Sequence, residues 1–508
     1  MSTAVIQRSG AGDTGGIGAE PHKTAILTLV CLVQLMVIID VSIVNVALPS
    51  IKIALHFSES DLQWVVNAYT LVFGGFLLLG GRASDLIGRR KVLMGGLALF
   101  SAASLACGLA QSEGMLIAAR AVQGLGGAII SPAALSILTV TFREGPERNR
   151  ALGVWGAVAG GGIALGVILG GLLSQGPGWR WVFFVNVPIG IISVLLAPRL
   201  LTESRDENTT RSFDIAGAVT VTAGLVLLVY AMVNTNTYGW GSARTVLELA
   251  GAVALLAVFV AIEARFASRP LVPMRIFGSR SLSGANLVSL LLGMMLFAVF
   301  FFLTLYMQQV LRFSPLQAGF SYIPFTVGIM ISSTLGSVAI NRVGVKWLLA
   351  AGLLISSAGI FMMTRLPDHG SYLTDILPAF IVTALGMGIV FLPLINAAVS
   401  GVRGEDAGLA SALVNTGQQV GGAVGLALLS TFATQRTSAV LAARPKAGLD
   451  HALVSGFHLA FLIGACLAVA AAILTLIAIP ANIGRSGPVE DLNLSENEEI
   501  EAQEAVPA

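Results

Sequence analysis

Two charged side chains, Asp40 and Arg120, lie deep inside stretches of sequence that are otherwise apolar. A charge buried in a membrane helix is costly, so each such residue is a functional hypothesis by default. The acids Asp214, Glu248 and Glu263 lie near the ends of apolar stretches, where they can reach water. At 1.5 Å per residue, Asp40 lies roughly 12 Å and Arg120 roughly 7 Å below the outer end of its predicted helix. Their depths therefore differ by about one helical turn.

An acid and a base at similar depth could carry out proton coupling. Burial favours the neutral form of a carboxyl group, whereas a nearby arginine favours the charged form. If the site opens alternately to the two sides of a membrane, Asp40 can load a proton outside and release it inside. Gln123, one turn from Arg120, could hydrogen-bond toward the same cavity, with Gly124 beside it. The alternative is a permanent Asp40–Arg120 ion pair that only fixes helix packing.

Composition predicts that membrane helices hold these residues. Of the 508 residues, 55% are hydrophobic and 11% are charged, whereas soluble domains carry about 25% charged residues. The lipid bilayer is therefore the predicted main partner. The net charge of +2 gives no indication of a nucleic-acid partner.

Apolar stretches of about 20 residues, the length that crosses a bilayer core, occur fourteen times in the chain. The sequence therefore predicts an all-α polytopic membrane protein. The longest connection between spans, at about residues 434–454, is too short for a catalytic domain. The predicted spans are residues 24–48, 62–81, 92–111, 115–140, 151–174, 181–201, 214–234, 245–263, 284–311, 316–340, 347–365, 373–400, 408–433 and 455–481.

The positions of lysine and arginine predict the orientation. With a cytoplasmic N-terminus, the inner segments hold 20 of the 29 basic residues, the outer loops hold eight, and Arg120 is within a span. An excess of basic residues marks the cytoplasmic side. We therefore expect a multi-pass protein of a bacterial-type inner membrane with both termini in the cytoplasm. Residues 1–23 form the predicted N-terminal tail, and the acidic residues 484–508 a disordered C-terminal tail.

An internal repeat predicts how the spans are grouped. Residues 80–90 read GGRASDLIGRR and residues 336–346 read GSVAINRVGVK, with glycine, Asp or Asn, glycine and a cation at the same offsets. The second copy follows eight spans after the first. Two six-helix halves, residues 24–201 and 284–483, with two inserted helices and a basic linker in residues 202–283, account for this spacing.

The first copy of the repeat is a candidate gating latch. Its acid, set between glycines, could meet an arginine or a helix N-terminus, and its basic residues could hold an inner gate closed by charge pairing. The alternative for the basic residues is that they only set the topology. The predicted latch residues are Gly81, Asp85, Gly88, Arg89 and Arg90.

Glycines recur at intervals of four in spans five and thirteen, which are repeat mates. This spacing places small residues on one helix face and lets two backbones approach closely. Generic tight packing explains any single pair, while recurrence in matching helices favours a shared gating role. The predicted packing residues are Gly162, Gly166, Gly170, Gly171, Gly421 and Gly425.

A stripe of soft, apolar side chains in span nine is a candidate for substrate contact. Met294, Phe297 and Phe301 lie on one helix face, and polarizable side chains suit varied apolar ligands. Core packing or lipid contact is the alternative explanation for these three residues.

Several of these motifs together resemble a known family. Residues 80–92 resemble the loop 2–3 motif of the major facilitator superfamily, and residues 39–49 resemble the first-helix motif of its fourteen-helix drug/proton antiporters. Residues 120–124 match the fourth-helix motif. Residues 179–188 resemble the entrance of span six in the same branch. Supporting likeness occurs at residues 270–277 and 417–425, so the resemblance covers most of the chain.

The resemblance implies that helices one and four are neighbours, and that the chain is a secondary-active multidrug exporter. It would export drugs or other apolar or cationic small molecules by proton antiport and alternating access. One position departs from the family pattern. The fifth-helix antiporter motif has a proline where this chain has Val167, before Gly170 and Gly171, so a proline bend in that helix is in doubt.

Three other functions would require different sequence features. A proton-coupled nutrient importer should have several buried charges in a polar cavity. A membrane sensor should carry a soluble signalling domain. An enzyme should place catalytic groups together, whereas the five histidines are scattered. No phosphate loop for ATP is present in the sequence. We therefore expect a monomeric transporter with no cofactor and no metal, coupled to protons, with sodium as the alternative ion.

Overall fold

In a computed structural model, the described residues are 20–481, apart from gaps at 59–60, 144–145, 205–213, 268–269, 401, 403–405 and 445–447. These residues form helices and no strand. The first part of the chain contains α1 (Glu20–Leu55), α2 (Trp64–Ile87), α3 (Arg89–Gly108), α4 (Glu113–Thr141), α5 (Pro146–Gln175), α6 (Trp181–Phe184) and α7 (Asn186–Leu200).

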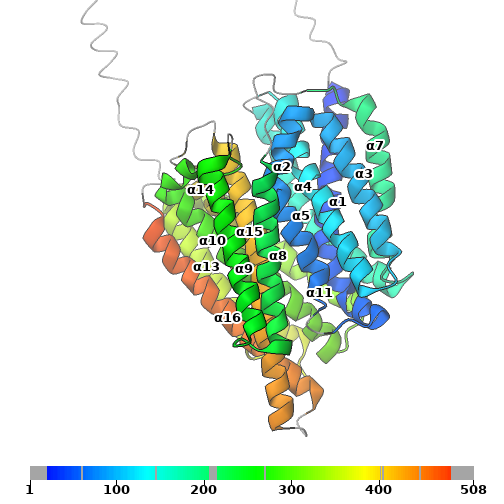
Figure 1. Cartoon of the computed structure of the whole chain (residues 1–508), viewed down its shortest axis with the longest axis vertical. Helices are drawn as coiled ribbons and strands as arrows, with labels where there is room; N and C mark the ends of the chain where they lie inside the picture. Colours follow the sequence, from blue (N-terminus) through cyan, green and yellow to red (C-terminus); the bar gives the residue numbers. More distant parts are fainter. Residues whose placement is uncertain are drawn as a thin grey trace, which may run out of the picture.

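The second part of the chain begins with two long helices and continues into a second bundle (Figure 1). The long pair is α8 (Ile215–Tyr238) and α9 (Ala243–Ala261), extended by η1 (Ile262–Phe266). The rest is η2 (Met274–Gly278), α10 (Arg280–Leu305), η3 (Tyr306–Val310), α11 (Pro315–Ser321), α12 (Ile323–Val343), α13 (Val345–Met363), η4 (Tyr372–Ile376), α14 (Leu377–Val399), α15 (Ala407–Ala443) and α16 (Leu449–Ala478).

The number of spans agrees with the sequence. Within the described residues, thirteen helical segments are long and apolar enough to cross a membrane. The fourteenth predicted span is α15, whose amides Asn415, Gln418 and Gln419 reduce its hydropathy. Since α15 packs against α2, α8, α10 and α16, it lies within the bundle like the other spans. The protein is therefore an all-helical, multi-pass membrane protein.

The structure differs from the predicted spans in one place. The predicted spans at 181–201 and 316–340 are each one membrane-length segment, Trp181–Leu200 and Pro315–Ile340, with a single turn residue, Val185 or Tyr322, between two helices. The connection expected at 434–454 is wrong as a loop. There α15 continues to Ala443 and α16 begins at Leu449, so a pair of helix ends projects beyond the bundle (Figure 1). Helix ends that project beyond the lipid need not be apolar. The polar residues in this pair therefore resemble a loop when only the sequence is considered.

The pattern of helix contacts repeats along the chain. In the first set, α1 packs on α5 and α7, α4 packs on α2 and α3, and α3 packs on α7. In the second set, α10 packs on α15 and α16, α14 packs on α12 and α13, and α13 packs on α16. Each helix thus has the neighbours of its predicted repeat mate, which supports the proposed duplication.

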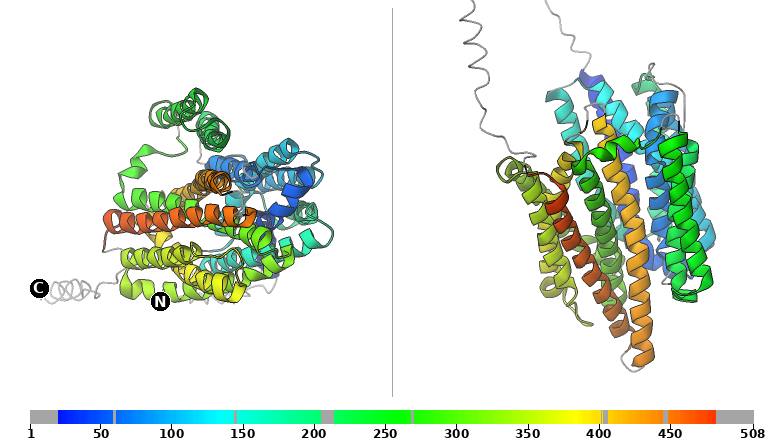
Figure 2. Two further views of the ribbon diagram at one scale, coloured as in Figure 1. Left: turned by 90° about the horizontal axis from the view of Figure 1, so that it is seen from below. Right: turned by 60° about the vertical axis from the view of Figure 1, so that its left-hand side comes forward.

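The two inserted helices lie outside both sets. α8 and α9 pack on each other, and α8 also contacts α2 of the first set and α15 of the second. Thr222 of α8 lies directly against Gly75 of α2, and Thr431 of α15 donates a hydrogen bond to the Met232 carbonyl at 3.0 Å. Figure 2 shows this pair standing at one side of the bundle, joined to α10 by the linker that contains η2.

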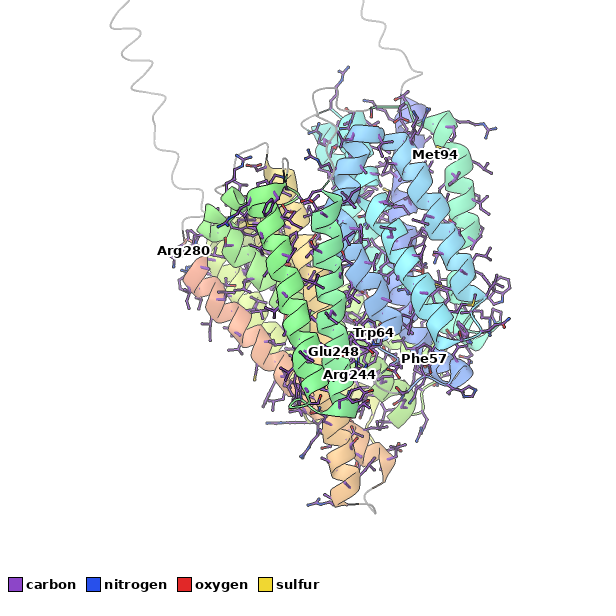
Figure 3. The ribbon with its side chains drawn as sticks, viewed as in Figure 1. Phe57, Trp64, Met94, Arg244, Glu248 and Arg280 are labelled. Atoms are coloured by element: carbon purple, nitrogen blue, oxygen red, sulfur yellow. The ribbon has the colours of Figure 1, made fainter. Side chains whose placement is uncertain are left out.

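The two ends of the bundle can be told apart. α1 begins and α16 ends at the same end (Figure 1). Met94 and Arg280 lie toward that end in Figure 3, whereas Phe57, Trp64, Arg244 and Glu248 lie toward the opposite end. An even number of spans requires this shared end for the two termini.

A candidate proton-coupling site

Asp40 and Arg120 form an ion pair in the core of the first helix set. Asp40 is on α1 and Arg120 is on α4, and their side chains are 0% and 1% exposed. Arg120 Nη1 donates to Asp40 Oδ2 at 2.6 Å. The two groups that were paired from their similar depth, and from the resemblance that makes helices one and four neighbours, are therefore in direct contact.

Two amides complete the hydrogen bonding of the carboxylate. Gln123 Nε2 donates to Asp40 Oδ1 at 2.7 Å, and Asn186 Nδ2 donates to the same oxygen at 2.9 Å. Both amides also donate to Ser104 Oγ at 3.1 Å, and Ser104 donates to the Phe183 carbonyl at 2.8 Å. All these polar side chains are fully buried. The network joins α1, α3, α4 and α7.

The guanidinium of Arg120 makes further contacts besides its bond to Asp40. Its Nε donates to the Val65 carbonyl of α2 at 2.9 Å, and its Nη1 donates to Gln123 Oε1 at 2.8 Å. Its carbon lies 4.3 Å from the centre of the Tyr69 ring, a cation–π contact. Gly124 lets α4 approach this region closely, because a Cβ there would lie 2.4 Å from the Tyr69 carbonyl oxygen.

The geometry sets what this site can do. A carboxylate that accepts three charge-assisted or amide hydrogen bonds is well satisfied as an anion. It is also completely buried, so water cannot deliver or remove a proton in this arrangement. Proton exchange at Asp40 therefore requires the helices to move apart and rearrange the network.

Sequence reasoning missed two members of the network, Asn186 and Ser104. Asn186 was included in the motif at 179–188 but was given no role. The available signal was a polar amide inside the otherwise apolar span at 181–201. Ser104 gave no signal, because serines are common in the small-residue stretches of membrane helices.

The predicted latch residues contact the segment that follows α7. Gly88 separates α2 from α3 with φ = 123°, and its predicted repeat mate Gly344 has φ = 85°, so both matching glycines use the left-handed region. Arg90 donates from its backbone N to Glu203 Oε1 at 3.2 Å and from Nη1 to the Leu201 carbonyl at 3.2 Å.

The rest of the latch extends the same contact. The Arg89 backbone N donates to the Ser204 carbonyl at 3.0 Å, and Gly81 lies in α2 facing Pro132 of α4. The side chain of Asp85 lies outside the described part of the chain. The predicted latch residues therefore contact the segment after α7, within one helix set, and the acid that meets Arg90 is Glu203. A role in gating stays a prediction.

The predicted packing glycines lie at two equivalent helix contacts. Gly162, Gly166 and Gly170 of α5 face α1. Gly421 and Gly425 of α15 face Leu290 and Met294 of α10, the repeat mate of α1.

Two further positions on α5, Val167 and Gly171, contact α11 of the second helix set. Gly171 faces Leu316 of α11, and Gly319 of α11 faces the Val167 carbonyl, so both positions join the two sets. α5 runs unbroken past Val167, the position of the missing proline.

The stripe on span nine lies at the same α10–α15 contact. Met294 is buried against Gly425, Phe297 is half-buried against Gly422, and Phe301 is buried. These are contacts of helix packing, the alternative explanation given above. A contact with substrate stays a prediction for these three residues. In the described residues, no group of His, Cys, Asp or Glu side chains is arranged to hold a metal ion.

Comparisons with known proteins place these observations in a family. The family model described as Major Facilitator Superfamily matches residues 30–426 and 325–502. The chain is 42% identical to the cephamycin export protein CmcT of Amycolatopsis lactamdurans, over 96% of this chain and 98% of that protein. It is 41% identical to the puromycin resistance protein pur8 of Streptomyces alboniger, over 84% of each. Among solved structures, it superposes on a bacterial homolog of the human lysosomal transporter Spinster with a TM-score of 0.66, at 16% identity, over 91% of this chain and 98% of that one.

Proposed function

The chain belongs to the major facilitator superfamily and is a drug exporter of that family, and we propose that protons binding at Asp40 drive the export. The observation that carries this proposal is the closed network around Asp40. It holds an acid that is fully buried in a membrane helix, and such acids are retained for function. Helix packing alone could use apolar side chains at no electrostatic cost.

The network suggests how proton binding drives a change in shape. Its members come from α1, α3, α4 and α7, so protonation of Asp40 would weaken the hold on four helices at once. A neutral carboxyl group binds Arg120 less strongly than a carboxylate does. Asp40 would take its proton when the outer side opens and lose it when the inner side opens. Export of cargo would then alternate with proton entry.

The contacts between the helix sets support alternating access. Val167 and Gly171 of α5 meet Leu316 and Gly319 of α11, and Gln308 donates to the Val46 carbonyl at 2.9 Å. These contacts lie toward the end opposite the start of α1. Toward the end where α1 begins, the two sets lean apart in Figure 1. We propose that this arrangement is closed on the outer side, and that Gln308 belongs to the outer closure.

The cargo that we propose is an antibiotic-like small molecule. The two relatives named above are called an export protein for cephamycin and a resistance protein for puromycin. The two six-helix halves would rock around a cargo site between them, as in many secondary transporters, while α8 and α9 stay at the side. We propose that the protein acts as a monomer.

We propose that both termini face the cytoplasm of an inner membrane, as the basic residues indicate. Ile53 and Ile87 provide a matched test, because both are more than half exposed and lie at opposite ends of the bundle. In a variant whose exposed Cys466 is replaced by serine, Ile87→Cys should react only with cytoplasmic thiol reagents and Ile53→Cys only with external ones. The reverse pattern would invert the topology.

Proteoliposomes with an imposed pH gradient test the coupling. Puromycin or a cephamycin, added as the probe, should move against its own gradient while a pH-sensitive dye reports protons moving the opposite way. Collapse of the gradient with a protonophore should stop this transport. Transport that is driven equally well by a sodium gradient at constant pH would replace the proton with sodium.

A further inference from the structure

Two buried carboxyl groups outside the Asp40 network lie at the base of the inserted helix pair. Asp214 precedes α8 and is 8% exposed, and Glu263 follows α9 within the π-helical turn η1 and is 4% exposed. A π turn is a frequent feature of functional sites, because it changes the direction in which a side chain points. Here it accompanies an acid that is buried while its neighbours Ala264 and Arg265 are exposed.

One oxygen of each carboxyl group has a donor. Asp214 Oδ1 accepts from the Gly217 backbone N at 2.7 Å, which caps α8. Glu263 Oε2 accepts from the Val272 backbone N at 2.9 Å. Glu263 thus ties the end of α9 to the linker that leads into α10.

The other two oxygens lie beside the same residue, Gly217. Asp214 Oδ2 and Glu263 Oε1 are buried and accept no hydrogen bond from any donor in the described part of the chain. Both lie beside Gly217, where an added Cβ would be 2.5 Å from the first and 2.8 Å from the second. A carboxylate oxygen only accepts hydrogen bonds, so these two oxygens can satisfy each other only if one of the two carboxyl groups carries a proton.

No cation offsets the two acids in the described residues. Arg265, on the same turn, is exposed, and Arg275 on the linker pairs with Asp406 at 3.4 Å. Two carboxylates in contact at a buried site cannot both be ionised without strong repulsion. One shared proton removes this repulsion and satisfies both free oxygens.

We propose that Asp214 and Glu263 form a second proton-binding site, separate from Asp40, which holds one proton between two carboxyl groups and thereby fixes the linker to the inserted helices. Loss of the proton would set two negative charges against each other and loosen the contact at Val272. The proposal does not depend on the role of Asp40.

The segment that this site holds also forms the wall of a cavity. Leu271 and Val272 line an apolar cavity of about 330 Å³ together with Gly75 of α2, Leu225 of α8 and Phe259 of α9. Release of the linker would therefore change a space that lies between α2, the inserted helices and α15. Proton binding at Glu263 and the shape of this cavity are linked through the Val272 hydrogen bond.

Infrared difference spectroscopy of the full-length protein in lipid nanodiscs tests the proposal. At neutral pH, the C=O stretch of a protonated carboxyl group should be present and should disappear on titration to alkaline pH. Glu263→Gln and Asp214→Asn should each remove this band, because neither leaves two carboxyl groups to share a proton. A band that persists unchanged in both variants would overturn the proposal.

Two controls assign the band. Glu248→Gln changes an acid on the same helix, but Glu248 pairs with Arg244 at 2.8 Å, so the band should remain. Asp40→Asn should also keep it, even if gradient-driven export is lost, which separates this site from the proposed function. Loss of the band in Asp40→Asn alone would assign the proton to Asp40 and reject the second site.

Thermal unfolding provides a readout if one variant folds poorly. A proton that is held more tightly in the folded state stabilises the fold at low pH, and this stabilisation is lost as pH rises. The wild-type unfolding temperature should therefore fall toward alkaline pH, and Glu263→Gln, whose amide can donate to Asp214, should flatten that fall. An equal pH dependence in wild type and Glu263→Gln contradicts the proposal.

Discussion

The two helix sets share a packing plan but differ in chemistry where their central helices meet. In the first set, α1 and α4 enclose the buried Asp40–Arg120 pair. In the second set, the repeat mates α10 and α14 carry no charged residue after Arg280 at the start of α10. Aromatic rings occupy the second set instead. Phe300 stacks on Tyr322 at 5.3 Å, and Phe380 lies 5.2 Å from both Tyr322 and Phe325.

The shared helix packing of the two sets therefore does not require a buried charged network, because the second set has none between α10 and α14. Hydrogen bonds to a carboxylate join α1, α3, α4 and α7 in the first set, whereas ring contacts join α10, α12 and α14 in the second. Ring contacts respond to volume and shape, whereas the Asp40 network also responds to protons. We therefore expect the first set to carry the ion coupling and the second set to provide a rigid apolar counterpart.

The largest expected effect is that of Asp40→Asn. The amide keeps the shape but cannot change charge, so gradient-driven export should fall to the level of empty proteoliposomes, while downhill exchange survives. Arg120 loses its buried partner, and breaking such a pair costs about 3–5 kcal/mol. The measurements are transport normalised to folded protein and the unfolding free energy.

The double variant Asp40→Asn/Arg120→Gln is the matched control for this prediction. Removing both charges should recover much of the stability, because no unpaired charge stays buried, but it should not recover gradient-driven export. Recovery of folding and uphill transport together would show that the pair is only structural, and the contrast between the two helix sets would then lose its functional meaning.

Phe380→Ala should have the next largest effect, and it should be an effect on stability alone. Phe380 is 1% exposed and contacts two rings, and truncating a buried phenylalanine costs about 3–5 kcal/mol. The protein that folds should still export against a gradient, with an unchanged pH profile. An altered pH profile in this variant would place coupling in the second set as well. Phe380→Leu is the control, and should lose less stability.

Gly421→Ala should disturb the contact between α10 and α15. Its Cβ would lie 2.0 Å from the Leu290 carbonyl oxygen, a rigid backbone atom, so the helices must separate. Overpacking of this kind costs about 1–3 kcal/mol, and unfolding should report it. Gly156→Ala on α5 is the control, since Gly156 is exposed and no atom lies within 4 Å of the added Cβ. Equal effects of the two substitutions would contradict the packing assignment.

The sequence predicted those features whose physical cause is local or periodic. The Asp40–Arg120 contact followed from residue depth, which a fixed rise of 1.5 Å per residue determines, together with the resemblance that makes helices one and four neighbours. The close contacts of Gly166 and Gly421 followed from four-residue spacing, which selects one helix face. Partners were harder to predict. Asn186 reaches Asp40 because α7 packs on α1 and α3, and nothing in the apolar sequence around Asn186 shows which helices it will face.

The carboxyl pair shows the same limit. Asp214 and Glu263 were treated as acids near span ends that reach water, and the structure buries both. They are 49 positions apart in the chain, so only the packing of α8 on α9 and η1 brings them together. The latch partner Glu203 was missed for a similar reason, because it follows α7 and meets Arg90 only after α3 has packed on α7.

The smallest expected effect separates the two copies of the repeat. Arg90 and its repeat mate Lys346 stand at the same offset from a left-handed glycine. Within the described residues, Arg90 alone of the two bonds to a neighbouring segment, through Glu203 and the Leu201 carbonyl. The Arg90 and Glu203 side chains are 29% and 26% exposed. A partly exposed pair of this kind contributes about 1 kcal/mol or less, so Arg90→Ala should change turnover only a few-fold. Lys346 lies over the Trp347 ring at 5.8 Å, and Lys346→Ala should leave turnover unchanged.

Both variants should bind the probe as the wild type does, because the contact lies away from the core network. If Arg90→Ala weakens equilibrium binding as much as it slows transport, this loop belongs to the cargo site. If Lys346→Ala slows turnover equally, the two loops act alike and the division of roles between the halves does not extend to their latches.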